Sequence, residues 1–215
     1  MLQYVVEEAY NLGPDHYNQE SLSTRYVLIN LASIHSTATS SSWCILYLAG
    51  YVPKNGGTYW ETLYQEILAV EKDSEEGAGV WTKRKLNKLV GLDSVLRESL
   101  QHSMASTVAM LRKCMKKGGH RFSNGLWIRE GEVVGIAAEA IQRQKRIEDT
   151  GSDDFDGFRF SRPYHELDPT TISGAIGQNS AVTTANEYLA FGHGKHAWLV
   201  LNPNLNQKLQ ENGEY

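Results

Sequence analysis

Three side chains suited to acid–base chemistry, His35, Ser36 and Thr37, follow one another in the most apolar stretch of the chain. An imidazole can act as a general acid or base, and hydroxyls can donate hydrogen bonds to developing negative charge. The structural alternative is that a helical Ser or Thr donates its hydroxyl to a carbonyl of the preceding turn. Both interpretations stay open for these residues.

A second group lies near the carboxyl end, where His193 and His196 precede Trp198. Histidine can hold a metal, but most histidines in a polar loop are solvated or hydrogen-bonded. Tryptophan offers only an indole N–H donor and no lone pair for a metal. Because Cys44 and Cys114 lack the paired spacing of zinc or redox motifs, we expect two ordinary thiols.

The elements that must position these residues are mostly helical. A helix over residues 24–49, roughly 39 Å long at about 1.5 Å per residue, carries the first group. Apolar spacing predicts further helices within 1–9, 60–70, 86–100 and 137–144, and strands at 107–112, 121–128 and 133–137. With a long irregular segment over 149–192, this order predicts an α+β, mainly α fold containing a small antiparallel sheet.

Composition narrows the class of protein. The chain has 215 residues, of which 41% are hydrophobic and 21% charged, and its formal net charge is -4. We therefore expect one domain over residues 1–215 and no nucleic acid partner. Residues 1–8 show no signal-peptide pattern, and the polar run 36–42 is costly at the centre of a bilayer. We expect a cytoplasmic protein without a membrane anchor.

Residues 188–197 (Tyr-Leu-Ala-Phe-Gly-His-Gly-Lys-His-Ala) resemble the loop written F-G-x-G-x-x-x-C-x-G in the fungal cytochrome P-450 family. In that family the cysteine thiolate is the axial haem ligand, and its electron donation favours O–O cleavage. Here the cysteine position is Trp198, and the glycine position two residues later is Val200.

Two further segments resemble parts of the family's Glu-Arg-Arg network. Residues 88–99 are similar to the K helix with its E-x-x-R pair, in which Glu98 is present but Gln101 stands at the arginine position. Residues 156–160 are similar to the meander, whose arginine completes the network. The resemblance therefore implies that Arg159 is the structural partner of Glu98.

Residues 30–37 look like the oxygen-activating stretch of the family's I helix. An alcohol-bearing residue there feeds protons to bound oxygen, and Ser36 or Thr37 would hold that place. The resemblance as a whole covers residues 1–197, and residues 198–215 form a divergent tail. It implies a truncated cytochrome P-450-like fold with a long I helix, J and K helices, a small antiparallel sheet and an irregular meander.

The family's amino-terminal half has no counterpart in this sequence. An apolar face of the I helix would then lack its cover, so we expect a homodimer or a partner chain to supply one. Because Trp198 occupies the cysteine position, we also expect no cofactor and no monooxygenase activity.

The first functional hypothesis is a haem-independent cyclase or pericyclase acting on a lipophilic terpenoid or polyketide intermediate of fungal secondary metabolism. An apolar pocket that orients a reactive intermediate, with a few donors, can accelerate a cyclisation. The candidate catalytic residues are His35, Ser36, Thr37 and Trp198. The candidate substrate-binding residues are Ile34, Met104, Thr107, Val108 and His193.

Two alternatives stay open. The chain is either a non-catalytic cytochrome P-450 remnant or interaction protein, or a residual haem-binding, monooxygenase-like protein with a loop histidine as the iron ligand. An absorbance spectrum separates the last alternative from the others.

Overall fold

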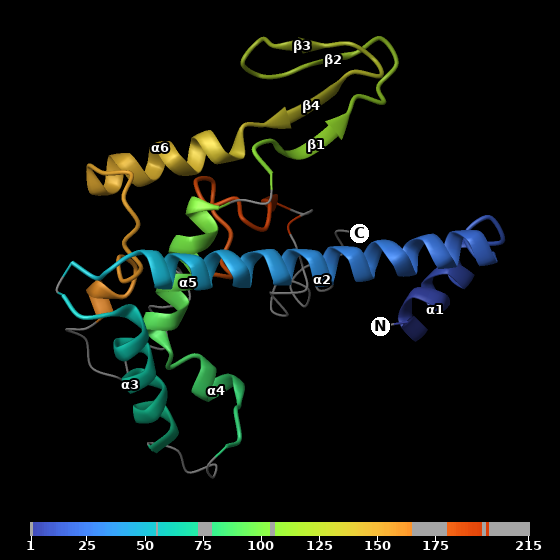
Figure 1. The fold of residues 1–215 in the computed structure, drawn as a ribbon. Coiled ribbons are helices and arrows are strands. Elements are labelled where there is room, and N and C mark those ends of the chain that lie inside the picture. The colour runs from blue at the N-terminus through green and yellow to red at the C-terminus, as the bar shows by residue number, and fades with distance from the viewer. Residues whose placement is uncertain are drawn as a thin grey trace. The chain divides into compact units, whose positions relative to one another are not determined.

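The computed structural model describes residues 2–54, 56–72, 79–103, 106–164, 180–194 and 197. The chain divides into two compact units, Met1–Trp43 and Cys44–Tyr215, and helix α2 crosses the boundary between them (Figure 1). The single domain expected over residues 1–215 stays a prediction.

The first unit consists of α1 (Leu2–Leu12) and most of α2 (Gln19–Gly50). Helix α2 begins earlier than the predicted residue 24 because Asn18 provides an amino-terminal cap. The Asn18 side chain accepts a hydrogen bond from the backbone N–H of Ser21 at 2.9 Å, which satisfies one of the N–H groups that a helix start leaves unpaired. The long I-like helix expected from the sequence is therefore present.

The second unit contains the remaining helices. These are α3 (Tyr59–Lys72), α4 (Lys83–Leu86), α5 (Val90–His102), α6 (Ala138–Thr150) and a 3-10 turn (Arg162–Tyr164). Helix α6 extends beyond the predicted residue 144 and stops at Gly151, whose φ of 69° is the left-handed conformation that commonly follows a helix.

Two antiparallel strand pairs lie between α5 and α6. Strand β1 (Ala109–Lys113) pairs with β4 (Val133–Ile136), and β2 (His120–Arg121) pairs with β3 (Trp127–Ile128). The strand predicted over 121–128 is instead a hairpin, because the Asn124 side chain accepts the N–H of Leu126 at 3.0 Å and Gly125 takes a φ of 89°. A mainly helical fold with small antiparallel pairs is confirmed.

The core of the second unit is a cluster of apolar side chains from α2, α3, α5 and the segment after α6. Phe155 stacks on Tyr47 with ring centroids 4.7 Å apart, and Tyr59 meets Phe155 edge to face at 5.7 Å. Val95 from α5 is fully buried in the same cluster. This packing joins α2, α3 and α5 to the segment that follows α6.

The amino terminus of α5 is capped from another helix. Its N-cap residue Leu89 makes no side-chain cap hydrogen bond, but Glu66 of α3 accepts the backbone N–H groups of Gly91 at 2.7 Å and Leu92 at 3.0 Å. A side chain at position 91 would crowd this carboxylate, since a Cβ there would lie 3.1 Å from Glu66 Oε1.

Across the described ranges, no helix combines the length and the apolar character needed to cross a bilayer.

Candidate functional site

A fully buried carboxylate, Glu98 on α5, organises the charged interior of the second unit. Its Oε2 lies 2.6 Å from Arg159 Nη2, and its Oε1 lies 3.1 Å from His102 Nε2 and accepts the backbone N–H of Asp156 at 3.2 Å. Arg159 Nη2 also donates to Oε1 of Gln101. The structure thus brings together Glu98, Arg159 and Gln101, the three positions that the sequence associates with the Glu-Arg-Arg network.

The guanidinium of Arg159 is itself largely buried, with a side chain 9% exposed. Burial lowers the pKa of Arg159, and the nearby Glu98 carboxylate acts in the opposite direction. A buried charge of this kind is costly unless it is paired. These contacts hold α5 to the segment after α6. The three groups that contact Glu98, namely Arg159, His102 and the backbone N–H of Asp156, all belong to this chain.

A second buried cation, Arg97, joins α5 to the loop that contains Tyr188. Its guanidinium lies 4.7 Å from the ring of Phe160 and 4.2 Å from the ring of Tyr188, and Nη1 donates to the carbonyl of Ser180 at 2.8 Å. Burial lowers the pKa of Arg97. Cation–π contacts of this kind strengthen when they are removed from water, so Arg97 holds the loop that contains Tyr188 against α5.

Three further groups hold the same loop. Tyr188 is buried, its hydroxyl donates to the carbonyl of Ala181 at 2.8 Å, and burial raises its pKa. Asp93 accepts the N–H of Ala181 at 3.0 Å, and burial raises the pKa of its carboxyl. Gln142 of α6 accepts the N–H of Leu189 at 2.8 Å.

Sequence reasoning missed Arg97, Asp93, Gln142, Tyr188 and His102 as parts of this network. Arg97 directly precedes Glu98, and His102 follows Glu98 by four residues. Residues four apart on a helix share a face, so the sequence could have indicated the contact between His102 and Glu98. Gln142 and Asp93 carry no such signal, because their partners are far away along the chain.

The predicted catalytic residues of α2 lie in the first unit. His35, Ser36 and Thr37 are exposed, and consecutive residues on a helix do not face one another. The Ser36 hydroxyl donates to the carbonyl of Ala32, the contact expected under the structural interpretation. Trp198, the fourth predicted donor, lies outside the described residues. The catalytic role of all four stays a prediction.

The predicted substrate-binding residues are dispersed over both units. Ile34 is 66% exposed in the first unit, where a shallow hollow of about 510 Å³ on α2 includes it with His35. In the second unit, Thr107 and Val108 precede β1, and His193 is exposed in the loop after Tyr188. Met104 lies outside the described residues. The role of these five residues stays a prediction.

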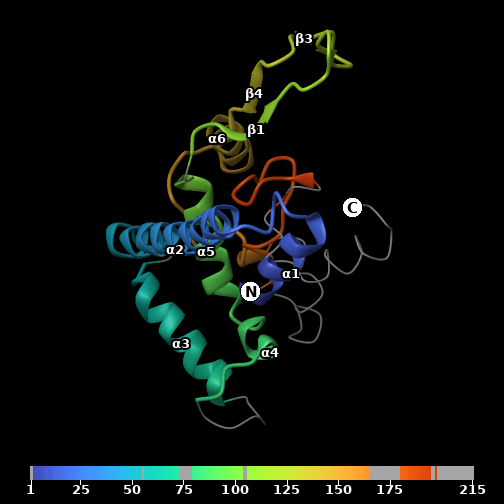
Figure 2. The ribbon, with the colours of Figure 1, turned by 90° about the vertical axis from the view of Figure 1, so that its right-hand side faces the viewer.

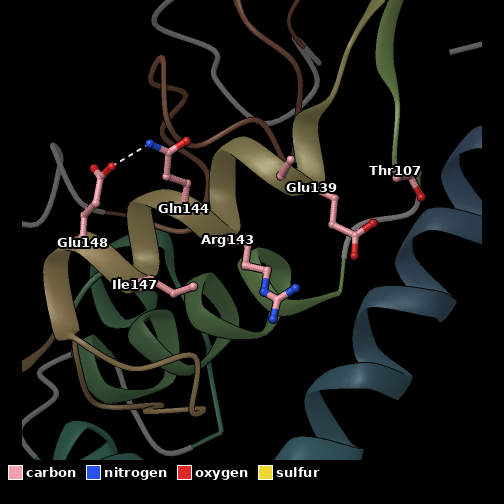
Figure 3. Close-up of a pocket in the computed structure, with 7 residues that line it drawn as sticks. Thr107, Glu139, Arg143, Gln144, Ile147 and Glu148 are labelled. Atoms are coloured by element: carbon pink, nitrogen blue, oxygen red, sulfur yellow. Dashed lines mark hydrogen bonds between the residues drawn. The ribbon is translucent and has the colours of Figure 1, made fainter.

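Described residues of the second unit also line hollows. One, of about 500 Å³, runs along α6, with Thr107 and Glu139 at one end and Glu148 at the other (Figure 3). The second, of about 480 Å³, lies among the strands and is lined mainly by apolar side chains, with Arg112 and Lys113 at its wall. Neither hollow contains a residue of the Glu98 network or of the loop after Tyr188.

The described residues include no group of three or more His, Cys, Asp or Glu side chains arranged to hold a metal ion. Both cysteines are buried on other elements, Cys44 in α2 and Cys114 directly after β1. Burial raises the pKa of the Cys44 thiol, which disfavours the thiolate.

Comparison with known proteins gives one consistent family. A family model described as Cytochrome P450 matches residues 1–211. The cytochrome P450 monooxygenase gloP of Glarea lozoyensis is 28% identical over 205 residues, covering 92% of this chain and 36% of that protein. The monooxygenase BOA4 of Botryotinia fuckeliana is 32% identical over 197 residues, covering 92% of this chain and 36% of that protein. The chain spans about a third of the length of the curated relatives that it matches.

A solved structure has the same fold. A zebra fish cytochrome P450 determined with progesterone superposes with a TM-score of 0.59 at 17% identity, covering 91% of this chain and 38% of the other. At this identity the likeness concerns the fold alone.

The expectation of no cofactor is wrong, because the family that the comparisons give is one that binds a cofactor. The relatives are cytochrome P450 monooxygenases, and that family binds haem. The donors of this chain do not match the usual thiolate ligand, however, because the described loop residues 188–194 and 197 include no cysteine. The sequence has an indole at position 198, and indole has no lone pair for iron.

Proposed function

This chain belongs to the cytochrome P450 family, and we propose that it is a folded, non-catalytic member with respect to monooxygenation. The observation that carries the proposal is the donor set: Trp198 stands at the thiolate position, and Cys44 and Cys114 are buried on other elements. Without thiolate donation, the O–O cleavage that monooxygenation requires loses its main electronic support.

The buried charges support the same proposal. Glu98, a buried carboxylate of α5, contacts Arg159, His102 and the backbone of Asp156, so its contacts are those of a structural group that joins α5 to the segment after α6. Under the proposal, these groups stabilise a scaffold through which the chain acts as an interaction protein or persists as a remnant.

The test is a carbon monoxide difference spectrum of the reduced protein, purified from cells supplied with a haem precursor. We expect no thiolate-type band, and no oxygenated product when an electron donor and lipophilic test substrates are added. The matched variant Trp198→Cys restores a sulfur at the family position and is expected to gain thiolate character. A thiolate-type band in the unaltered protein would disprove the proposal, and Cys44→Ser and Cys114→Ser would then identify the donor.

The redox-neutral cyclase stays a prediction, with His35, Ser36, Thr37 and Trp198 as its donors. Incubation of the purified chain with late terpenoid or polyketide intermediates tests it, and cyclisation no faster than in buffer contradicts it. His35→Ala is the informative variant. Ser33→Ala is the matched control, because Ser33 is exposed on the same helix and is not among the proposed donors.

A further inference from the structure

The hollow of about 480 Å³ among the strands of the second unit has the size and the lining of a small-molecule site. Ligand pockets usually enclose about 300–1,000 Å³ and combine a mainly apolar wall with a few polar groups. Of the described residues that line this hollow, none is among those that the sequence assigned to catalysis or to substrate contact. The apolar side chains of its wall include Met110, Phe122, Leu126, Ile128, Val134 and Ile136.

Two strand pairs supply this wall. On the β2–β3 hairpin, the N–H of Phe122 donates to the carbonyl of Leu126 at 2.8 Å, so these residues lie opposite each other across the turn. On the other pair, Arg112 is directly opposite Val134, and directly paired residues share a face. Figures 1 and 2 both show the hairpin continuing from the β1–β4 pair.

The backbone of the β1–β4 pair is irregular where it borders the hollow. The register shifts between Ala109 and Arg112, and Met110 in between has a φ of 54°, a strained value for a residue with a side chain. A bulge of this kind changes the direction of side chains, and Met110 lies in the wall. Opposite, Gly135 leaves room that a Cβ would fill, since it would lie 2.6 Å from Val108 Cγ1. Local strain of this kind is often retained where it shapes a binding site.

The charged groups of the wall are cations. Arg112 and Lys113 both line the hollow, and neither forms an ion pair with another described residue. Arg112 Nη1 donates to a backbone carbonyl at 2.8 Å, which leaves its charge uncompensated. Residues 99–129 contain no acidic side chain, and the carboxylates that follow, Glu130 and Glu132, are not among the described residues of the wall. The hollow is therefore suited to an anion.

We propose that this hollow binds a small carboxylate with an apolar body, and that Arg112 and Lys113 hold the carboxylate. A guanidinium matches the two oxygens of a carboxylate, and charge-assisted hydrogen bonds are stronger than neutral ones. The apolar body is removed from water against the apolar side chains of the wall. The described residues of the hollow include none of the Glu98 network, so this site does not depend on whether the chain holds haem.

The test is isothermal titration calorimetry of the full chain with naphthoate, an aromatic carboxylate, and with naphthamide, an uncharged analogue of the same shape. We expect naphthoate to saturate one site with a Kd of about 1 mM or tighter. Naphthamide should bind at least about tenfold more weakly, because it lacks the charged acceptor. Equal affinity for the two compounds, or no saturable binding of naphthoate, would overturn the proposal.

The cations of the wall are tested by Arg112→Gln/Lys113→Gln, which should lower the affinity for naphthoate at least about tenfold. The matched control is Lys116→Gln/Lys117→Gln, which removes the same charge at exposed positions of the same segment outside the wall. Its affinity should stay within about twofold of that of the unaltered chain, because salt screens exposed charges. Circular dichroism checks that both variants fold. An equal loss in the two variants would show unspecific attraction and contradict the proposal.

The buried thiol of Cys114 reports where the ligand lies, because Cys114 lines the hollow and Cys44 of α2 does not. Alkylation of each thiol is followed by mass spectrometry of the peptides. At a naphthoate concentration about ten times the Kd, alkylation of Cys114 should be roughly tenfold slower, while Cys44 should react at an unchanged rate. Binding that leaves Cys114 unprotected would assign the ligand to another place on the chain and would refute the site.

Discussion

At position 101 a glutamine replaces the arginine that the family's K helix places there, and the structure shows how the neighbourhood accommodates it. Arg159 donates to Gln101 and also meets Glu98, while His102 contacts the other oxygen of Glu98 at 3.1 Å. Glu98 therefore keeps two side-chain partners. The sequence alone suggested a single arginine partner, because the His102 contact was not recognised.

If His102 substitutes for the missing arginine, the two positions should be coupled. We predict that His102→Leu lowers the free energy of unfolding by about 1.5–3 kcal/mol, the usual range for a hydrogen bond to a charged group. In a Gln101→Arg background the same change should cost about 1 kcal/mol less, because the new guanidinium contacts Glu98. Urea unfolding of the four proteins measures the cycle. Strict additivity would contradict the coupling.

The Asp153 carboxyl has a pKa below its ordinary value because Arg146 donates hydrogen bonds to it, with a smaller contribution from Arg143. A carboxyl whose pKa is lower in the folded state stabilises the protein above its unfolded-state pKa, about 4, and loses that contribution as pH falls through the folded-state value.

We therefore predict that Asp153→Asn destabilises the protein at pH 7 and that the difference from the unaltered chain narrows below about pH 4. Thermal unfolding at a series of pH values measures this. Asp154→Asn is the control, since the hydrogen bonds of Asp154 to other described residues are local ones to Ser152. A difference that stays constant down to pH 2 would show that the ion pair is not responsible.

At the scale of elements, α5 depends on α3. Glu66 satisfies two backbone N–H groups at the start of α5, and its negative charge lies at the positive end of the helix dipole. Gly91 leaves the space that this carboxylate occupies. The contact spans 25 residues of sequence, so neither helix reveals it alone.

We predict that Glu66→Ala lowers the free energy of unfolding by about 1–2 kcal/mol, comparable to the loss of a helix cap. Glu66→Gln should lose less, because an amide oxygen still accepts one N–H. Glu61→Ala on the same helix is the control, since Glu61 is exposed and contacts Gln65 locally, and it should change stability by about 0.5 kcal/mol or less. Chemical unfolding separates the three variants.

At the scale of the whole molecule, the exposed apolar side chains of α2 in the first unit bear on the expected partner. Val27 is 61% exposed, Leu31 59% and Ile34 66%. With Ala38 they recur at intervals of four, three and four residues, the spacing that packs one helix against another. A second copy of the chain fits this spacing, because an identical stripe is its own complement.

We predict that Leu31→Glu/Ile34→Glu shifts the purified chain from dimer to monomer, since burying those carboxylates in an apolar contact is costly. Sedimentation velocity over a range of concentrations measures the change. Ser33→Glu/Ser36→Glu adds the same charge on the opposite side of the helix and should leave a dimer. A monomeric unaltered chain at high concentration would contradict the prediction.

The sequence by itself determined the family, the positions of the longer helices and the pairing of Glu98 with Arg159. Helices and strands follow from periodicity over neighbouring residues, which is a local property. The motifs at residues 188–197, 88–99, 156–160 and 30–37 carried the resemblance. The substitution at Trp198 is likewise visible without coordinates.

Only the tertiary structure decided which distant groups meet. Arg97 reaches the carbonyl of Ser180 across 83 residues, and Gln142 reaches the N–H of Leu189 across 47. The hairpin at residues 120–128 replaced a predicted strand because a local turn competed with the apolar pattern. Contacts of this kind depend on how the helices, strands and loops pack against one another. A local segment of sequence does not determine that packing, because the packed surfaces come from segments far apart in the chain.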